Sequence, residues 1–263
     1  MTGLRTPPDY VPGHGLLPGR HAVVTAAAGA GIGFATAKKI AEEGAAGLLI
    51  SDIHEGRLEQ ARAAIAGATG VPVHAQTCDV SRAGDVQALV QRAASLFPRV
   101  DLLVNNAGFG SAKALLDMSD EDWDRVQDIT LKGTFRMTRE MLRHMRDHGG
   151  GVIVNNASVL GWRAQVEQSH YAAAKAGVMA FTRCAALEAV EYGVRINAVS
   201  PSFAVHDFLR RSAPEEVLAE LEAKEAYGRG AECWEVANVI VFLASDYSSY
   251  MTGETVAVSS RRA

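Results

Sequence analysis

The chain has 263 residues, of which 48% are hydrophobic, and its 26 basic and 30 acidic side chains give a net charge of −4. A chain of this length and apolar content can bury a large core as one domain. The charges are mixed along the chain without a basic cluster, so nothing argues for a nucleic-acid partner. The three cysteines match no metal-ligand spacing, which predicts no metal site and is typical of a reducing cytoplasm.

The amino-terminal region shows neither a secretory pattern nor a membrane span. It has no charged start followed by an apolar run, and no segment reaches the roughly eighteen apolar residues of a spanning helix. We therefore expect a cytoplasmic protein without a membrane partner. Residues 1–20 contain four of the eight prolines, which predicts an irregular arm that lies on the body, lies on a neighbouring subunit, or is disordered.

The first predicted unit is a strand, a glycine turn and a helix. Residues 21–25 form a short apolar run typical of a strand, AAAGAGIG follows, and a helix is expected over 34–43. Gly29, Gly31 and Gly33 allow the backbone to come close to a bound group, and the N–H groups that begin the helix can bind a pyrophosphate. The turn is weak evidence on its own, but its position predicts a dinucleotide site.

Two acidic residues follow the next strands. The apolar run 47–50 leads to Asp52, about twenty residues after the glycines, where a carboxylate can accept hydrogen bonds from an adenosine ribose and repels a 2′-phosphate. We therefore expect NAD rather than NADP, although His54 and Arg57 could weaken that preference and NADP stays possible. Asp79 could accept a hydrogen bond from an adenine amino group, or it could cap the next helix.

The remaining elements continue the alternation. Helices are predicted at 55–66, 83–96, 121–146, 171–191 and 232–244, and strands at 71–76, 102–105, 152–156, 194–199 and, as an edge strand, 255–258. Repeated units of this length predict an α/β fold, a single doubly wound Rossmann-type domain over 21–263 with a parallel sheet of about seven strands and helices on both faces. Ligands bind at the carboxyl ends of such strands, where we expect Gly29, Asp52, Asn105, Ser158 and Pro201.

Candidate catalytic groups lie in the stretch 155–175, NNASVLGWRAQVEQSHYAAAK. Tyr171 and Lys175 are four residues apart in an alanine-rich, helix-favouring segment, so they share one helix face. A neighbouring ammonium favours the phenolate, and a close lysine together with one further positive neighbour could lower the pKa of the phenol by about three units in a partly dry cleft. The Ser158 hydroxyl could hold a substrate oxygen against that phenol, which predicts proton transfer to or from a carbinol oxygen. The alternative is an ordinary helix with a solvated lysine and a core tyrosine.

After Pro201 the alternation lapses. Residues 202–213 mix aromatic and basic side chains, a combination that suits a lid over an apolar substrate with an anionic extension. A solvated amphipathic helix explains the same residues. We place the candidate lid at about 202–226.

The motifs TAAAGAGIG, NNAG, Ser158 with YAAAK, and RINAVSP occur in this order over nearly the whole chain from Arg20. The series resembles the classical short-chain dehydrogenase/reductase family. The resemblance implies that Tyr171 is the general acid/base, that Ser158 donates to the substrate oxygen, and that Lys175 holds the nicotinamide ribose and lowers the Tyr171 pKa. It implies a cofactor site formed by Gly29, Gly31, Ile32, Gly33, Asp52, Asp79, Val80, Asn105, Asn106, Ala107, Gly108, Tyr171, Lys175 and Pro201.

More narrowly, ASVLGWRAQ, SHYAAAKAGVMA and LASDYSSYMTGE resemble reductases encoded in bacterial steroid-catabolism clusters. This resemblance implies a substrate derived from the last two sterol rings, a hydroxylated or oxo hydrindane acid carried as a CoA thioester. The candidate substrate residues are Ser158, Leu160, Trp162, Phe203 and His206, with Phe109 beside them and Lys113, Arg163, Arg210 and Arg211 available for phosphates. Trp162 could equally be a core residue. Family members usually form homotetramers or dimers, which makes Trp123 and Phe135 candidate interface residues.

Three features depart from the family pattern. The glycine turn is one residue longer than TGxxxGxG, and Ala26 replaces its first glycine. Thr130 stands where the family has an asparagine that completes the catalytic tetrad, and because a backbone carbonyl could still hold the relay water, we expect slower turnover rather than none. Ser202 and His206 replace the glycine and threonine that follow the proline and contact the nicotinamide amide.

The leading hypothesis is an NAD-dependent oxidoreductase that interconverts a secondary alcohol and a ketone. A second hypothesis within enzymes is an NADPH-dependent 3-oxoacyl-thioester reductase. The non-enzyme hypothesis is a dinucleotide-binding scaffold or sensor that has lost catalysis, for which Thr130 is the best argument. The intact set of Ser158, Tyr171 and Lys175 speaks against it, because a binding module has no need of a tuned phenol.

Overall fold

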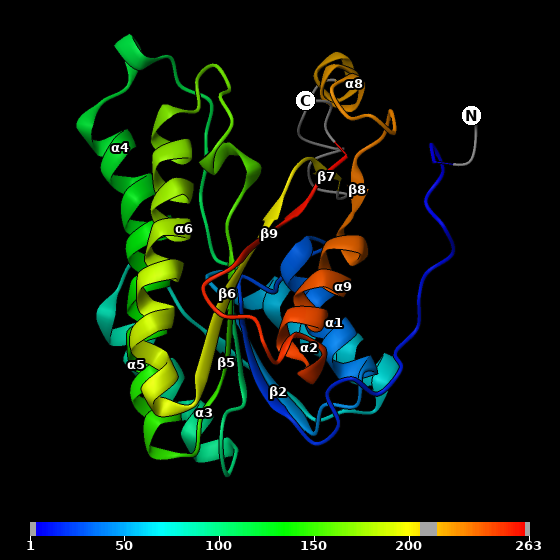
Figure 1. Cartoon of the computed structure of the whole chain (residues 1–263), viewed down its shortest axis with the longest axis vertical. Helices are drawn as coiled ribbons and strands as arrows, with labels where there is room; N and C mark the ends of the chain where they lie inside the picture. Colours follow the sequence, from blue (N-terminus) through cyan, green and yellow to red (C-terminus); the bar gives the residue numbers. More distant parts are fainter. Residues whose placement is uncertain (1–3, 206–214, 261–263) are drawn as a thin grey trace.

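The computed structural model describes residues 4–205 and 215–260 of the chain. Its centre is a sheet of seven parallel strands in the order β3-β2-β1-β4-β5-β6-β9 (Figure 1). The strands are β1 (His21–Thr25), β2 (Gly47–Asp52), β3 (Val73–Thr77), β4 (Leu102–Asn105), β5 (Gly151–Asn156), β6 (Val194–Pro201) and β9 (Thr255–Val258). The order reverses between β1 and β4, and doubly wound sheets bind ligands at such a point. The predicted fold class is confirmed.

Helices cover both faces of the sheet (Figure 1). One face carries α1 (Ile32–Glu42), α2 (Glu55–Thr69) and α9 (Cys233–Ala244). The other carries α3 (Ala83–Leu96), α4 (Asp120–Val126), α5 (Gly133–Asp147) and α6 (Ser169–Ala189). Beyond the carboxyl end of β6 lie α8 (Glu215–Ala223) and a small sheet of β7 (Ala204–Val205) and β8 (Ala231–Glu232). Within the described residues, no helix combines the length and apolarity needed to cross a membrane.

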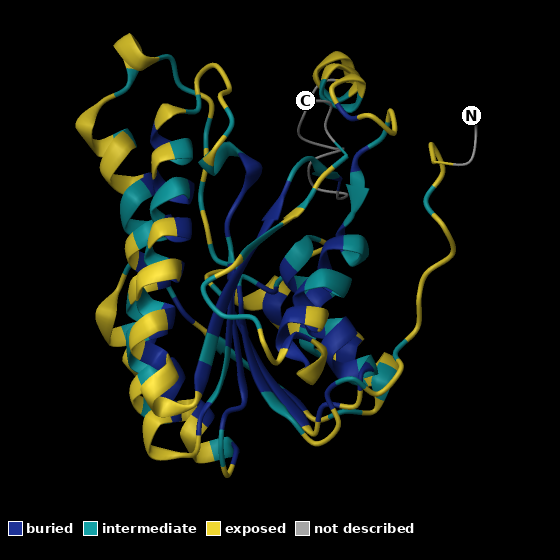
Figure 2. Ribbon diagram, viewed as in Figure 1, coloured by how far each residue is buried: buried dark blue, intermediate teal, exposed yellow. Residues whose placement is uncertain are grey.

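The core consists of two apolar layers, one on each face of the sheet. Successive side chains of a strand point to opposite faces, so Ala22 and Val24 of β1 pack with α1 and α9, whereas Val23 packs with α3 and α5. Figure 2 shows the inner strands of the sheet largely buried and the outer faces of the helices exposed, whereas the edge strands β3 and β9 are only partly covered. The parallel sheet is therefore rigid, and it holds the ends of its strands in fixed places.

The helix predicted at 121–146 is interrupted in the structure. A π-helical segment, Gln127–Lys132, lies between α4 and α5, and all three form one continuous run. A π turn accommodates one extra residue per turn and is frequent at functional sites. Here it contains Thr130, whose side chain is fully buried.

Residues 4–20 follow an irregular path along the body of the molecule (Figure 1). Leu17 is buried in the core, the Tyr10 hydroxyl donates a hydrogen bond to Glu42, and the Tyr10 ring packs edge-on against Trp234 at 5.5 Å between centroids. Of the three arrangements considered for the arm, the described part lies on the body.

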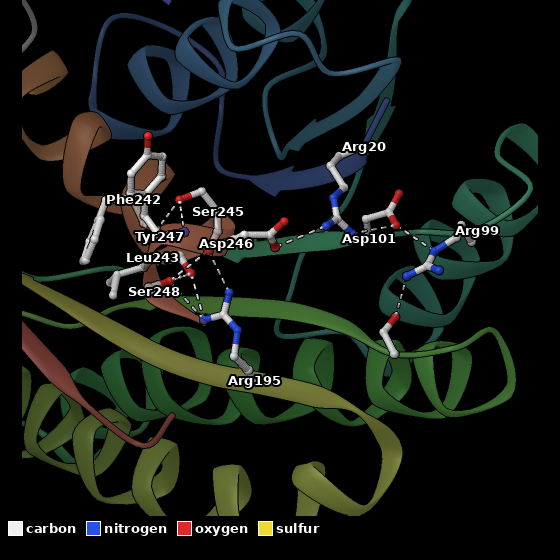
Figure 3. A network of polar contacts seen from close by, with 11 residues as sticks. Arg20, Arg99, Asp101, Arg195, Phe242, Leu243, Ser245, Asp246, Tyr247 and Ser248 are labelled. Carbon is white, nitrogen blue, oxygen red and sulfur yellow. Dashed lines mark hydrogen bonds and ion pairs between the residues drawn. The ribbon is translucent and has the colours of Figure 1, made fainter. Parts of the chain in front are cut away.

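A polar network joins segments at the amino ends of the strands (Figure 3). Asp101, just before β4, forms ion pairs with Arg20 at 3.6 Å and with Arg99 at 2.6 Å, and Arg20 also contacts Asp246 at 3.4 Å. Arg195 of β6 donates to the backbone oxygens that follow α9, including that of Ser245 at 3.0 Å. This network lies at the edge of the sheet opposite the candidate site, so it serves the fold.

Candidate active site

The glycine-rich turn between β1 and α1 leaves the start of α1 open. Gly29 has a φ of +89°, a conformation that favours glycine, and a Cβ on Gly33 would lie 2.2 Å from the Ala26 backbone oxygen. No side chain caps the amino terminus of α1, so its first N–H groups are available to an anionic group. These features fit the pyrophosphate of a dinucleotide. Ala26 itself has a φ of +51°, so this position would suit the glycine of the family pattern.

A cleft of about 450 Å³ lies beside the turn, and its lining includes Ala26, Asp52, His54, Asp79, Val80, Ala107, Gly108 and Phe109. Asp52 ends β2, where one carboxylate oxygen accepts from the Ala28 N–H at 3.2 Å and the other from the His54 N–H at 3.1 Å. Burial raises the pKa of Asp52, and the hydrogen bond from Ala28 and the charge of Arg57 oppose that rise. The carboxylate is therefore oriented by backbone donors at the mouth of the cleft.

Asp79 serves the backbone and also borders the cleft. One oxygen accepts from the N–H and the hydroxyl of Ser81, at 2.9 and 2.7 Å, and so stabilises the turn before α3. Asp79 also lines the cleft, so the hydrogen bond to an adenine amino group stays a prediction in addition to the observed role in the turn.

The two asparagines that end β4 point in different directions. Asn105 is buried, and its amide donates to Thr138 and Asn155 at 2.9 Å each, so it joins β4 to β5 and α5 rather than facing the cleft. Asn106 donates to the Ala26 oxygen at 3.0 Å and accepts from the Asn156 amide at 2.8 Å. Asn106 therefore ties the glycine turn to the end of β5.

Thr25 is a supporting residue that the motif analysis missed. Its hydroxyl oxygen accepts from the N–H groups of Asn106 and Ala107 at 3.0 Å each. The threonine of TAAAGAGIG thus fixes the loop after β4, and its place at the end of the first strand was the signal for this role.

Ser158 and Tyr171 are brought together above the carboxyl end of β5. Ser158 lies two residues after the end of this strand and Tyr171 lies in the first turn of α6, and the two side chains come close enough for Ser158 to act on the pKa of the phenol. Burial raises the pKa of Tyr171, and the bond with Ser158 opposes the rise. Both residues line a pocket of about 350 Å³, so a ligand oxygen in this pocket can exchange a proton with the phenol.

Lys175 lies under the Tyr171 ring, with Nζ 5.6 Å from the ring centroid. It is buried, its ammonium donates to the Asn156 backbone oxygen at 2.5 Å, and burial lowers its pKa to about 8. The spacing of four residues therefore brings the amine and the phenol to one face of α6, as the sequence predicts.

The lowered pKa that the sequence predicts for Tyr171 is not found in the protein alone. The pKa of Tyr171 is raised, because burial of the phenol outweighs the hydrogen bond with Ser158. The same burial weakens the ammonium, since it lowers the pKa of Lys175. A phenolate here needs a positive charge additional to that of the lysine.

Thr130 is engaged with the loop after β4. Its hydroxyl accepts from the Phe109 N–H and donates to the Phe109 oxygen, at 3.0 Å each. Its backbone oxygen accepts from the Thr134 hydroxyl at 2.8 Å, and a carbonyl has a second lone pair for a further donor. The Thr130 side chain therefore holds the backbone of Phe109. The Thr130 backbone carbonyl remains the group that is predicted to hold the relay water.

The loop 107–113 covers the Tyr171 ring and is bonded to the start of α6. A Cβ on Gly110 would lie 2.8 Å from Cδ2 of the ring. The Ser111 hydroxyl contacts Nε2 of the fully buried His170 at 3.2 Å, and the Gln168 amide donates to the Ser111 oxygen at 3.1 Å. The loop therefore fixes the position of the phenol.

Replacing Gly110 with alanine is expected to lower kcat by roughly a hundredfold, because a side chain there must displace the Tyr171 ring or the loop, and ångström-scale misplacement costs about this much. Steady-state rates with a secondary-alcohol substrate measure the effect. Gly67→Ala is the matched control, since a Cβ at Gly67 of α2 meets open space. Equal rates for both variants would show that the contact between Gly110 and the Tyr171 ring does not position the phenol.

The 350 Å³ pocket contains part of the predicted substrate set. Its lining comprises Ser158, Val159, Leu160, Gln165, Gln168, Tyr171, Ser202, Phe203, Leu221, Lys224 and Glu225. Ser158, Leu160 and Phe203 were predicted as substrate residues. Leu221, Lys224 and Glu225 fall within the candidate lid at 202–226 but were not singled out, and Gln165 and Gln168 were not named as substrate residues. Trp162 is neither core nor lining, since 49% of it is exposed.

The other predicted contacts lie elsewhere. Phe109 borders the cofactor cleft, where the Arg125 guanidinium stacks on its ring at 4.3 Å. Lys113 pairs with Asp122 at 3.4 Å, and Arg163 donates to the Ser259 hydroxyl at 3.1 Å. His206, Arg210 and Arg211 lie outside the described residues, as does most of the candidate lid before α8.

A dinucleotide cleft at the switch point of a parallel sheet, beside a buried serine, a half-buried tyrosine and a buried lysine, defines a nicotinamide-dependent oxidoreductase of the Rossmann type. The chain belongs to the short-chain dehydrogenase/reductase family. A family model described as Enoyl-(Acyl carrier protein) reductase matches residues 26–260. The predicted family and the predicted oxidoreductase activity on CH–OH groups are confirmed.

Named relatives cover nearly all of the chain. One relative is a (5R,7aS)-5-hydroxy-7a-methyl-1-oxo-2,3,5,6,7,7a-hexahydro-1H-indene-carboxyl-CoA reductase of Mycobacterium tuberculosis. The two sequences are 57% identical over an alignment that covers 97% of this chain and 98% of the relative. This chain is 44% identical over 91% of its length, and 94% of the relative, to a cis-4-hydroxycyclohexanecarboxylate dehydrogenase of Sinomonas cyclohexanicum. A crystal structure of a short chain dehydrogenase from Mycobacterium smegmatis superposes with a TM-score of 0.88, 54% identity, and coverage of 99% of this chain and 100% of the other.

Proposed function

We propose that this oxidoreductase interconverts a ring hydroxyl and a ring ketone on a steroid-derived, bicyclic carboxyl-CoA thioester with NAD. The similarity to the Mycobacterium tuberculosis reductase over almost the full length carries the proposal. The pocket supports it, because Val159, Leu160, Phe203 and Leu221 give its lining apolar surface suited to fused rings, and Ser158 and Tyr171 line the same pocket.

The chemistry proposed for the site follows from the described contacts. When bound, the nicotinamide ring would supply the hydride acceptor or donor, and in its oxidised form a positive charge. The Ser158 hydroxyl holds the substrate oxygen beside Tyr171, whose phenolate takes the hydroxyl proton in oxidation and whose phenol returns it in reduction. Lys175, anchored on Asn156, stabilises the phenolate and lies where it can bind the ribose. Thr130 holds the Phe109 loop over these groups.

The test is turnover of bicyclic hydroxy and keto acids and their CoA thioesters, followed by nicotinamide absorbance. We expect the thioester to be turned over faster than straight-chain 3-oxoacyl thioesters, because a fused ring fills the apolar wall. Preference for a 3-oxoacyl thioester with NADPH would instead support the second enzyme hypothesis. Dinucleotide binding without any turnover would support the scaffold hypothesis.

The preference for NAD is also a proposal, supported by the oriented carboxylate of Asp52. Replacing Asp52 with asparagine is expected to lower kcat/KM for NAD roughly tenfold and to raise that for NADP, because the repulsion of a 2′-phosphate disappears. Rates with both cofactors give the ratio. Glu55→Gln, an exposed acid at the start of α2, is the control. An unchanged ratio in the Asp52 variant would refute the assignment.

We further propose a homo-oligomer, a tetramer or dimer, in the cytoplasm. Trp123 and Phe135, together with Leu187 and Val190, leave apolar surface on the helices of one face of the molecule. Surface of this kind favours association with a second copy. Light scattering of the purified chain measures the assembly. None of the cysteines in the described part of the chain forms a disulfide, which supports a reducing compartment.

A further inference from the structure

The wall of the substrate pocket contains a buried carboxylate outside the catalytic group. Glu225, two residues after α8, is 4% exposed and lines the pocket together with Ser158 and Tyr171. The Ser260 hydroxyl donates to its Oε2 at 3.0 Å, and the Ala226 N–H donates to the Ser260 oxygen at 2.6 Å. The carboxylate is therefore held in one place between α8 and the segment that follows β9.

The basic residues nearest to Glu225 in the sequence, Lys224 and Arg229, form ion pairs with other acidic residues. Lys224 lines the same pocket, but it is 43% exposed and its ammonium pairs with Glu220 at 2.7 Å. Arg229 binds both oxygens of Glu235, at 2.7 and 2.9 Å. Within residues 4–205 and 215–260, no cation forms an ion pair with Glu225. Because Lys224 and Arg229 pair with other acids, Glu225 is the acid without an ion-pair partner among the lining residues that the structure describes.

The rest of the described lining is neutral. Gln165, Gln168 and Ser202 contribute polar groups without charge, and the remaining wall is apolar apart from the catalytic hydroxyls. A wall of this kind screens a charge poorly, so the repulsion between Glu225 and an anionic ligand persists across the pocket. The second oxygen of Glu225 can accept a hydrogen bond from an N–H or O–H of a neutral ligand.

We propose that Glu225 is a specificity-determining residue that makes the pocket select a neutral, esterified carboxyl group over the free carboxylate. The inference rests on the proposed function, in that the substrate is taken to be a ring alcohol or ketone that carries a carboxyl group. In a thioester the carboxyl carbon bears no charge, whereas the free acid brings a second anion into a pocket that already holds one. Specificity then comes from repulsion of the wrong form.

The test compares a ring alcohol with and without a charged carboxyl group. The probes are cis-4-hydroxycyclohexanecarboxylate and its methyl ester, whose dissociation constants are measured by calorimetry with NAD present and whose KM and kcat are measured separately. In the unmodified protein we expect the ester to bind more tightly than the acid by roughly tenfold or more, the size expected for one repulsive charge across a partly dry pocket. Glu225→Gln should reduce that ratio at least about fivefold through KM rather than kcat.

Glu222→Gln is the matched control, because it removes the same charge from the same segment at a residue outside the pocket lining. Its ratio of acid to ester affinity should equal that of the unmodified protein. An equal effect of the two substitutions, or no change of the ratio in Glu225→Gln, overturns the inference.

A second variant tests the same repulsion if Glu225→Gln does not fold. Glu220→Gln removes the exposed partner of Lys224, so a free ammonium would offset Glu225 and the acid should bind several-fold more tightly while the ester does not. An unchanged ratio in this variant overturns the inference as well. Because binding is measured apart from turnover, absence of turnover with the expected affinity ratios would refute the proposed function but leave the role of Glu225 standing.

Discussion

Replacing Tyr171 with phenylalanine is expected to lower kcat by roughly a thousandfold in both directions, while the nicotinamide dinucleotide still binds. General acid–base catalysis by a positioned side chain contributes about 10²- to 10⁴-fold, and the variant removes only the hydroxyl that exchanges the proton. The phenylalanine ring keeps the packing against Gly110, and Lys175 keeps its bond to Asn156. The loss therefore falls on the chemical step.

The pH dependence of the unmodified protein follows from the same phenol. Oxidation of the alcohol needs the phenolate, and burial raises the pKa of Tyr171, so the oxidation rate should rise with pH towards the alkaline range. Reduction of the ketone needs the protonated phenol and should fall over the same range. Both dependences should disappear in Tyr171→Phe.

Rates at a series of pH values and titration of the dinucleotide by fluorescence give the two readouts. Tyr250→Phe is the control, since Tyr250 is fully exposed and far along the chain from the site. If Tyr171→Phe kept more than about a tenth of the kcat, another group would have to be the acid/base.

Replacing Lys39 with methionine is expected to lower the free energy of unfolding by about 3 kcal/mol, because it leaves a buried carboxylate without its partner. Lys39 and Glu43 are each 2% exposed and lie 3.4 Å apart in α1. The arm completes this pair: Lys39 donates to the Val11 oxygen at 2.5 Å, and Glu43 accepts from the N–H groups of His14 and Leu16 at 2.8 and 3.1 Å.

The pair also makes stability depend on pH. Burial opposes ionisation of Glu43, but the N–H groups of His14 and Leu16 and the charge of Lys39 together hold its pKa below the usual range. A lowered pKa in the folded state contributes stability above the pKa of the unfolded chain, and that stability is lost as the pH falls through the folded value. The methionine variant should show a weaker dependence, because the N–H groups of His14 and Leu16 remain while the charge of Lys39 is gone.

Urea unfolding followed by circular dichroism measures the change. Lys38→Met is the matched control, because the neighbouring Lys38 pairs with Glu42 near the surface at 3.4 Å, and such pairs are worth at most about 1 kcal/mol. A loss in Lys39→Met no greater than in the control would show that the arm and this pair do not stabilise the domain.

Much of the fold and of the candidate site was predictable because its signals are local. The strand, glycine turn and helix at 21–43 are consecutive in the chain, so the residues of this segment predict its local structure. Tyr171 and Lys175 share a helix face because four residues make about one turn. The sequence by itself determined the parallel sheet, the family and the redox class.

Only the tertiary structure decided what depends on segments distant in the chain. The pocket wall joins Leu160, Phe203 and Glu225, which lie on separate elements, and no local pattern reports which side chains such elements turn inward. The raised pKa of Tyr171 was equally out of reach, because it comes from burial of the phenol, to which a loop some sixty residues earlier contributes, and burial outweighs the contact with Ser158. The spacing of residues along one helix or strand determines which side chains can come into contact. The packing between elements determines how far those side chains are buried, and burial sets their pKa values.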